Sequence, residues 1–248
     1  MRYTPWFFYY LNRTIYFMAV TEADLVIQVP HTMGSITLDQ YQRYVKVLEN
    51  NKGAEESDFV GMKFIEIFCD TSLENVNNIH FSVFDEIAGI LGEAFKQKTP
   101  LIRHFKMGDV EFGFIPNIGK MSIGEYIDIE HSIGDWSNVH KAMAVLFRPI
   151  KKKKGDKYII KKYSPTDSTT EAMKQMPLDV VLGARVFFYL LGKDLLSHTL
   201  NYLEKEMLKT NNKQISQQMD LLAKSGVGIN QFIESLTEMP HRLRKQQK

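Results

Sequence analysis

The stretch Phe114 to Ile150, FIPNIGKMSIGEYIDIEHSIGDWSNVHKAMAVLFRPI, decides the fold prediction. It is dense in aromatic and aliphatic residues, but it contains no metal-ligand cluster, phosphate loop or nucleophile elbow. Ser122 and Glu125 have the spacing of a capping box, which predicts a helix beginning there. A second helix is expected from about Gly134 to Pro149, with one apolar face formed by Trp136, Val139, His140, Met143, Leu146 and Phe147. We therefore expect a packed recognition fold, in which Trp136 and Phe147 are core residues.

The residues before this stretch predict further helices and a hairpin. A strand is expected over 24–29, and a helix capped by Thr37 over 37–50. Two more helices are predicted over 59–69 and from Ser82 to about Phe95 by apolar residues at helical spacing. Residues 101–114 alternate around Gly108-Asp109, which is typical of a β-hairpin.

The residues after this stretch indicate a second hairpin and then helices. Lys151–Lys154, followed by Gly155-Asp156 and KYIIKKY, predict a hairpin with a basic tip. Ser168 and Glu171 form another capping-box pattern, and Pro177 suits the first turn of a helix that Gly192 ends or bends. Further helices are expected over 195–208, 215–223 and 229–236. The fold class is therefore α+β, helix-rich, with short β-hairpins in the N-terminal and middle parts and an all-helical C-terminal part.

The expected domain organisation follows from changes in composition. Residues 18–150 form an α+β domain, 151–170 a basic hairpin or linker, 171–240 a helical domain and 241–248 a basic tail. Residues 1–17 contain eight of the chain's 29 aromatic residues. They are interpreted either as a non-native leader, with translation starting at Met18, or as an N-terminal strand or helix docked on the core.

Composition excludes several classes of protein. The chain has 248 residues and a formal net charge of +2, too small to indicate nucleic-acid binding by overall charge. Its uncharged N-terminal run is about half the length that a membrane span needs, so we expect no membrane insertion. The single cysteine, Cys69, cannot form an intrachain disulfide and is interpreted as a buried apolar residue, consistent with a reducing cytoplasm.

The sequence offers little catalytic chemistry. No phosphate-loop, dinucleotide-binding or zinc motif is present, so we predict no catalytic residues, no cofactor and no metal. Glu125 and Asp128 could share a helix face and bind a hard cation, but the favoured interpretation makes Glu125 part of a capping box. His140 is interpreted as a core histidine. The lysine run is interpreted as solvated, because no aromatic residues alternate with the lysines, and nucleic-acid contact is not expected.

Three segments resemble a group of uncharacterised proteins encoded among the tail-assembly genes of large tailed phages. They are FIPNIGKMSIGEYIDIE, IGDWSNVHKAMAVLFRPI and EAMKQMPLDVVLGARVFFYLLGKDLLSHTLNYLE, and the resemblance covers roughly residues 18–236. The function that this resemblance implies is that of a tail assembly chaperone, which keeps the tape-measure protein soluble while the tail tube assembles. The family has no agreed motif from which functional residues could be transferred.

The leading hypothesis is a non-enzymatic phage tail assembly factor in the host cytoplasm. The alternative is a virion structural protein, such as a ring, connector or baseplate component. Expected partners are the tape measure or other virion proteins, and self-association remains open. A helix apolar on all sides predicts either a partner-binding surface in the C-terminal helices or the central helix of a C-terminal bundle. Its candidate residues are Phe187, Phe188, Leu191, Leu195 and Leu196.

Overall fold

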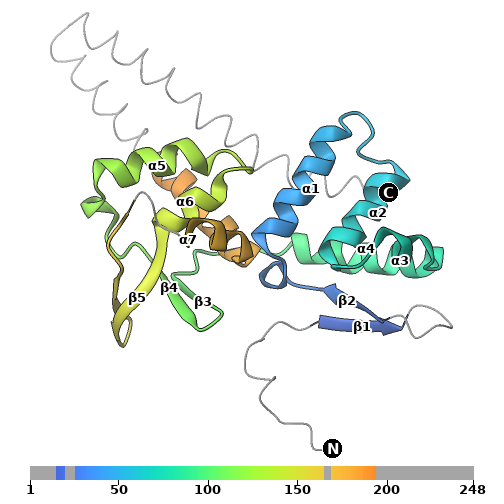
Figure 1. Cartoon of the computed structure of the whole chain (residues 1–248), viewed down its shortest axis with the longest axis horizontal. Coiled ribbons are helices and arrows are strands. Elements are labelled where there is room, and N and C mark those ends of the chain that lie inside the picture. The colour runs from blue at the N-terminus through green and yellow to red at the C-terminus, as the bar shows by residue number, and fades with distance from the viewer. Residues whose placement is uncertain (1–14, 20–25, 165–168, 194–248) are drawn as a thin grey trace, which may run out of the picture. The chain divides into compact units, whose positions relative to one another are not determined.

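The computed structural model describes residues 15–19, 26–164 and 169–193, with side chains from residue 26 onward. Within these residues the chain is an α+β protein, as the sequence predicts. It divides into two compact units. The first contains the described residues up to Lys98 and the segment Lys174–Asp179, and the second contains Thr99–Met173 and the described residues from Val180 onward (Figure 1).

The first unit combines a two-stranded antiparallel ribbon with helices. In the ribbon, Ile15 pairs with Pro30 and Ala19 pairs with Val26. Helix α4 packs against β2, and α2 packs against both α1 and α4. The elements are β1 (Ile15–Ala19), β2 (Val26–Pro30), α1 (Leu38–Asn50), α2 (Asp58–Phe68), α3 (Leu73–Asn77) and α4 (Phe81–Phe95).

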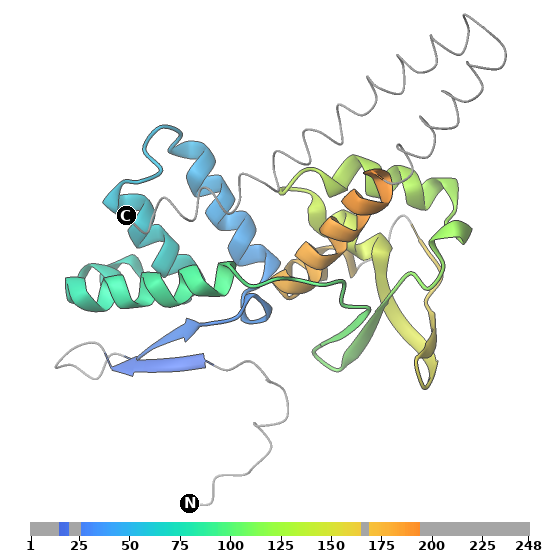
Figure 2. The same ribbon diagram turned by 180° about the vertical axis from the view of Figure 1, so that it is seen from behind.

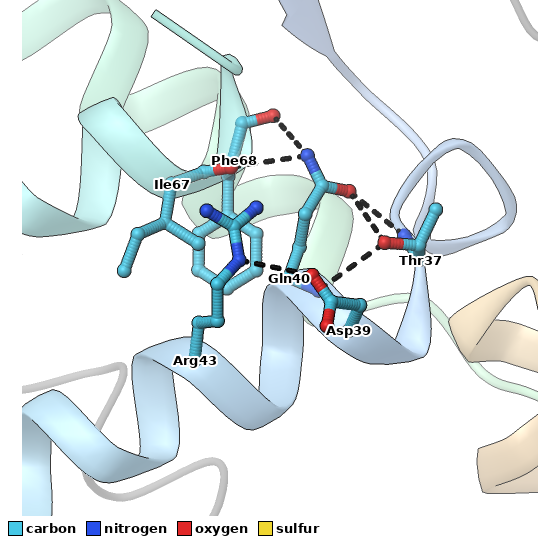
Figure 3. A network of polar contacts seen from close by, with 6 residues as sticks. All are labelled: Thr37, Asp39, Gln40, Arg43, Ile67 and Phe68. Atoms are coloured by element: carbon cyan, nitrogen blue, oxygen red, sulfur yellow. Dashed lines mark hydrogen bonds and ion pairs between the residues drawn. The ribbon is translucent and has the colours of Figure 1, made fainter. Parts of the chain in front are cut away.

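Helix α1 begins at a complete capping box, as Thr37 predicts. The Thr37 hydroxyl accepts a hydrogen bond from the Gln40 backbone N–H at 3.2 Å, and the Gln40 side chain accepts one from the Thr37 N–H at 2.9 Å. The Gln40 amide also donates to the carbonyls of Ile67 and Phe68 at 3.0 and 3.3 Å (Figure 3). One side chain therefore caps α1 and satisfies carbonyls at the C-terminal end of α2.

An aromatic cluster forms the core between these helices. The rings of Tyr44, Phe64 and Phe68 lie 5.2–5.3 Å apart, and Phe95 of α4 lies 5.2 Å from Phe68. Tilted and edge-to-face arrangements of this kind add to the stabilisation from buried area.

A distant segment completes the first unit. The Leu38 N–H donates to the Met176 carbonyl at 2.9 Å, and the Leu178 N–H donates to the Ile36 carbonyl at 2.9 Å. Thr37 and Pro177 form an antiparallel bridge between these bonds. Residues 174–179 thus extend the first unit even though residues 99–173 separate them from it in sequence.

The second unit is built on a four-stranded antiparallel sheet of order β3-β4-β5-β6. Helices α5 and α6 pack against each other, and α7 packs against α6. Residues 178–193 are helical, drawn in orange in Figure 2. The elements are β3 (His104–Met107), β4 (Val110–Phe114), α5 (Ile123–Ile133), α6 (Val139–Leu146), β5 (Phe147–Lys154), β6 (Lys157–Ile160) and α7 (Thr169–Ala172).

Phenylalanine rings from three strands and the 178–193 helix form the core of this unit. Phe147 lies 5.5 Å from Phe105 and 5.2 Å from Phe114, and Phe114 lies 5.6 Å from Phe187. The 178–193 helix also approaches the 99–103 segment closely, because a Cβ on Gly183 would stand 2.3 Å from the Pro100 carbonyl oxygen. Only glycine fits at that position without a shift of the backbone.

The predicted helix over 134–149 is shorter than expected. Helix α6 ends at Leu146, and Phe147 begins strand β5, which pairs with β4 through Phe114, Gly113 and Phe112. Pro149 therefore lies in a strand and does not terminate the helix. Phe147 is buried as predicted, but Trp136 precedes α6 and is only half-buried, so the prediction that it is a core residue is wrong. The last described helix includes Gly192 and reaches residue 193, where the described residues stop, so the prediction that Gly192 ends or bends it stays a prediction.

The compact units also differ from the predicted domains. Contacts divide the expected 18–150 domain at Lys98, since the helices before this residue and the sheet after it have separate cores. The predicted hairpin within 151–170 exists, but its strands belong to the sheet of the second unit and do not form a linker. Residues 15–17 of the predicted leader pair with β2, which favours the alternative of an N-terminal strand, while a start at Met18 stays a prediction.

The remaining predictions for the C-terminal part, including the helices after residue 193 and the basic tail, lie outside the described residues. Among the residues that are described, the structure contains no helix that is both long enough and apolar enough to cross a membrane.

Candidate functional site

The sequence fixes where α5 begins. The Glu125 carboxylate accepts hydrogen bonds from the Ser122 N–H at 2.7 Å and from the Ser122 hydroxyl at 2.8 Å, and the hydroxyl accepts one from the Glu125 N–H at 3.3 Å. This is the predicted capping box, and it satisfies N–H groups that the first turn leaves without helical partners.

The inner side of α5 is anchored by an ion pair. The Glu125 carboxylate lies 2.8 Å from a terminal nitrogen of Arg148 on β5, and the two side chains are only 10% and 9% exposed. On the next turn the Tyr163 hydroxyl donates to the Asp128 carboxylate. Burial, this hydrogen bond and the nearby negative charges raise the pKa of Tyr163 to about 12. Both carboxylates thus have protein partners, which confirms the capping-box interpretation of Glu125.

The outer side of α5 exposes apolar side chains. Ile123 is 76% exposed, Tyr126 52% and Ile127 42%. Their i, i+3, i+4 spacing places them side by side on one helix face. Partial burial and the neighbouring Glu130 carboxylate raise the pKa of Tyr126 above its ordinary value. We call Ile123, Tyr126 and Ile127 the α5 apolar face, and we take it as the candidate functional site.

The predicted partner-binding residues pack within the second unit where they are described, and a role for them in partner binding stays a prediction. Phe187 and Phe188 are half-buried, and their rings lie 5.6 and 6.3 Å from the Phe114 ring of the sheet. Packing in the second unit accounts for their apolar character. Leu191 is also half-buried, whereas Leu195 and Leu196 lie outside the described residues.

Two further sets of polar contacts, made by Arg185 and His140, lie in the same unit as α5. The Arg185 guanidinium lies 3.8 Å from the centre of the Trp136 ring and donates to the Ile133 carbonyl at 3.1 Å, at the C-terminal end of α5. His140 is buried, as predicted, and its Nε2 lies 3.4 Å from the Glu171 carboxylate. The first set of contacts joins α5 to the 178–193 helix, and the second joins α6 to α7.

Each unit also contains a polar cavity. The one in the second unit has a volume of about 330 Å³ and is lined by Arg148, Lys141 and His131, among others. The one in the first unit has a volume of about 400 Å³ and lies beside the Gln40 network of Figure 3.

Cys69 lines the cavity of the first unit. Burial raises the pKa of its thiol to about 12, so the nucleophilic thiolate is scarce at neutral pH. Across the part of the chain that the structure describes, no group of three or more histidine, cysteine or acidic residues could hold a metal ion.

Comparison with known proteins does not assign a family: no protein-family model, curated protein or solved structure matches the chain. The sequence predicts the start of α5 but does not reveal its exposed face. The available signal was the pair of isoleucines four residues apart, which a buried helix would show equally well.

Proposed function

We propose that the protein is a phage tail assembly factor that binds an apolar helical segment of a tail protein, the tape measure above all, through the α5 apolar face. The observation that carries the proposal is the exposure of Ile123, Tyr126 and Ile127 on one face of a helix whose other face is anchored. The resemblance to tail assembly chaperones supports the choice of partner.

The spacing of these side chains suits a helical partner. Residues at i, i+3 and i+4 form the ridges that pack into the grooves of a second helix. Such a face recognises an amphipathic helix through a few apolar anchors. Full burial of an isoleucine contributes about 1.5–3 kcal/mol, so two largely exposed isoleucines provide several kcal/mol before the cost of association. This modest affinity suits a factor that must release its client when the tail tube forms.

The test is co-expression of the full chain with the tape-measure protein of the same phage. In the test variant, Ile123→Ser and Ile127→Ser remove both aliphatic anchors. A matched control, Phe59→Ser with Phe81→Ser, removes two exposed aromatic side chains from the first unit. We expect the wild-type chain and the control to keep the client soluble and to co-purify with it, and the test variant to lose both properties.

Client solubility and co-purification that survive in the test variant, with its circular dichroism unchanged, would show that binding does not use α5. A second measurement separates a chaperone from a virion structural protein. A chaperone acts in the host cytoplasm and is absent from purified particles, whereas a ring, connector or baseplate component is present in a fixed copy number. Detection in particles at fixed stoichiometry would replace this proposal with the structural one.

A further inference from the structure

Positive charge is concentrated in the hairpin formed by β5 and β6. Residues 151–162 contain seven lysines and one aspartate, a formal charge of +6 in a chain whose total is +2. The rest of the chain is therefore net acidic. This concentration is local, so the small net charge of the whole protein does not reveal it.

The hairpin extends beyond its neighbouring strand. Strand β5 pairs with β4 only through Phe147, Arg148 and Pro149. After a register shift between Ile150 and Lys152, its remaining residues pair with β6. The outer half of β5 and all of β6 thus form a two-stranded ribbon, visible beside β3 and β4 in Figure 1.

One face of the ribbon is held by β4. The Lys153 ammonium lies 2.5 Å from the Glu111 carboxylate, and this contact lowers the pKa of Glu111. The Tyr158 hydroxyl, on the residue paired with Lys153, donates to the Phe114 carbonyl at 2.8 Å. The Tyr158 ring also fills the space above Gly113, where a Cβ would stand 2.5 Å from it.

The opposite face presents lysines to solvent. Alternate residues of a strand point to opposite faces, so Lys152, Lys154 and Lys157 lie on the face away from Lys153 and Tyr158. All three are exposed, and Ile159, paired with Lys152, is 62% exposed. We call Lys152, Lys154 and Lys157 the lysine face.

The like charges of the lysine face destabilise the ribbon that carries them. Lys154 and Lys157 are direct cross-strand partners, and like charges in that position destabilise a sheet. The repulsion is relieved when a partner places several negative charges over the ribbon. Side chains on alternate strand residues are about 6.6 Å apart. A row of ammonium groups at this spacing suits a polymer that carries negative charges at short, regular intervals.

We propose that the lysine face binds the phosphate backbone of duplex DNA without reading its sequence. All seven cations within residues 151–162 are lysines, which bind phosphate as point charges and lack the directional two-pronged contacts of arginine, as suits binding that does not read sequence. A two-stranded ribbon has dimensions that the major groove accepts. The sequence alone predicts a solvated run of charges. The strand register shows in addition that three of the lysines lie on one face of the ribbon.

The lack of interleaved aromatic residues, which argues against stacking on single-stranded bases, is no obstacle to this mode of binding. Phosphate contacts with a duplex need no base stacking and supply most of non-specific affinity. The proposal is independent of the α5 apolar face and of the phage tail client.

The experiment measures fluorescence anisotropy of a labelled 30-base-pair duplex of arbitrary sequence, titrated with the full chain at 50–200 mM salt. The test variant carries Lys152→Gln, Lys154→Gln and Lys157→Gln. The control carries Lys46→Gln, Lys52→Gln and Lys98→Gln, which remove the same charge from exposed lysines of the first unit. Poly-glutamate and vesicles with an anionic lipid are titrated in parallel.

Wild type and control should bind the duplex with dissociation constants on the order of 10⁻⁴–10⁻⁶ M, the range of non-specific binding. The test variant should bind at least about tenfold more weakly, with a salt slope smaller by about 2.7, since each lost phosphate contact removes about 0.9. Equal binding by the test variant and wild type would overturn the proposal, as would an equal loss in the control. Tighter lysine-dependent binding to poly-glutamate or to vesicles would also overturn it.

Discussion

Replacing Glu125 with glutamine tests how strongly the buried ion pair stabilises the second unit. The change keeps an oxygen that can accept the hydrogen bond from the Ser122 N–H, but it removes the negative charge that faces Arg148 at 2.8 Å. The Arg148 guanidinium is then left without its counter-charge in a site where the side chain is only 9% exposed.

The expected cost follows from that burial. Removing one member of a buried ion pair destabilises a protein by about 3–5 kcal/mol, because the remaining charge stays desolvated. Losing the cap alone, as in Ser122→Ala, should cost about 1 kcal/mol. The double variant Arg148→Met with Glu125→Gln removes both charges and leaves neither unpaired. Its loss in free energy of unfolding should therefore be smaller, by at least about 2 kcal/mol, than the summed losses of the two single variants.

The assay is urea unfolding followed by tryptophan fluorescence. Trp6→Phe in every variant leaves Trp136 of the second unit as the only tryptophan. With a denaturant dependence of about 2 kcal/mol per molar urea, a loss of 4 kcal/mol lowers the midpoint by about 2 M. A coupling free energy within about 0.5 kcal/mol of zero would refute the reasoning, since the pair would then contribute no more than one at the surface.

Three other predictions concern buried positions. Gly183→Ala should destabilise the second unit by about 1–3 kcal/mol, because the added Cβ meets the Pro100 carbonyl. Gly89→Ala should stabilise α4 by about 0.5–1 kcal/mol, because nothing lies within 4 Å of the added Cβ. Thermal unfolding of the two variants measures both effects. The Cys69 thiol should resist alkylation at pH 8 until the chain unfolds. Because its pKa is raised from about 9 to about 12, the unfolded state loses this proton first, and the free energy of unfolding should fall as pH rises from 9 towards 12. Phe147→Ala should cost about 3–5 kcal/mol in urea unfolding, and a cost below about 1 kcal/mol would contradict its place in the core.

Local signals predicted the helix starts well. Thr37 with Gln40, and Ser122 with Glu125, fix the first turns of α1 and α5 through contacts between residues three apart. The turn at Gly108 was predictable for a similar reason, because its φ of 57° favours glycine. Such features depend on a few neighbouring residues, and the chain contains all the information needed to recognise them.

Features that depend on distant contacts were predicted poorly. Phe147 continues the apolar spacing of α6, yet it begins β5 because β4, more than 30 residues earlier, provides a strand to pair with. The division at Lys98 likewise reflects which side chains share a core. For the candidate site, the sequence indicated apolar residues in α5 and in the 178–193 helix, but only packing distinguishes the exposed Ile123 from the half-buried Phe187.

The return of residues 174–179 to the first unit sets an order for its folding during synthesis. A ribosome that has made residues up to Lys98 has supplied helices α1 to α4 of that unit but not the backbone partners of Ile36 and Leu38. Residues 99–173 must be made first, which takes on the order of ten seconds at an elongation rate of about 5–20 residues per second. During that interval the nascent chain carries a bundle with one open edge, and the sheet of the second unit is emerging before the first is complete. A rare-codon pause placed after Lys98 would lengthen this interval and give nascent-chain chaperones more time to bind the open edge.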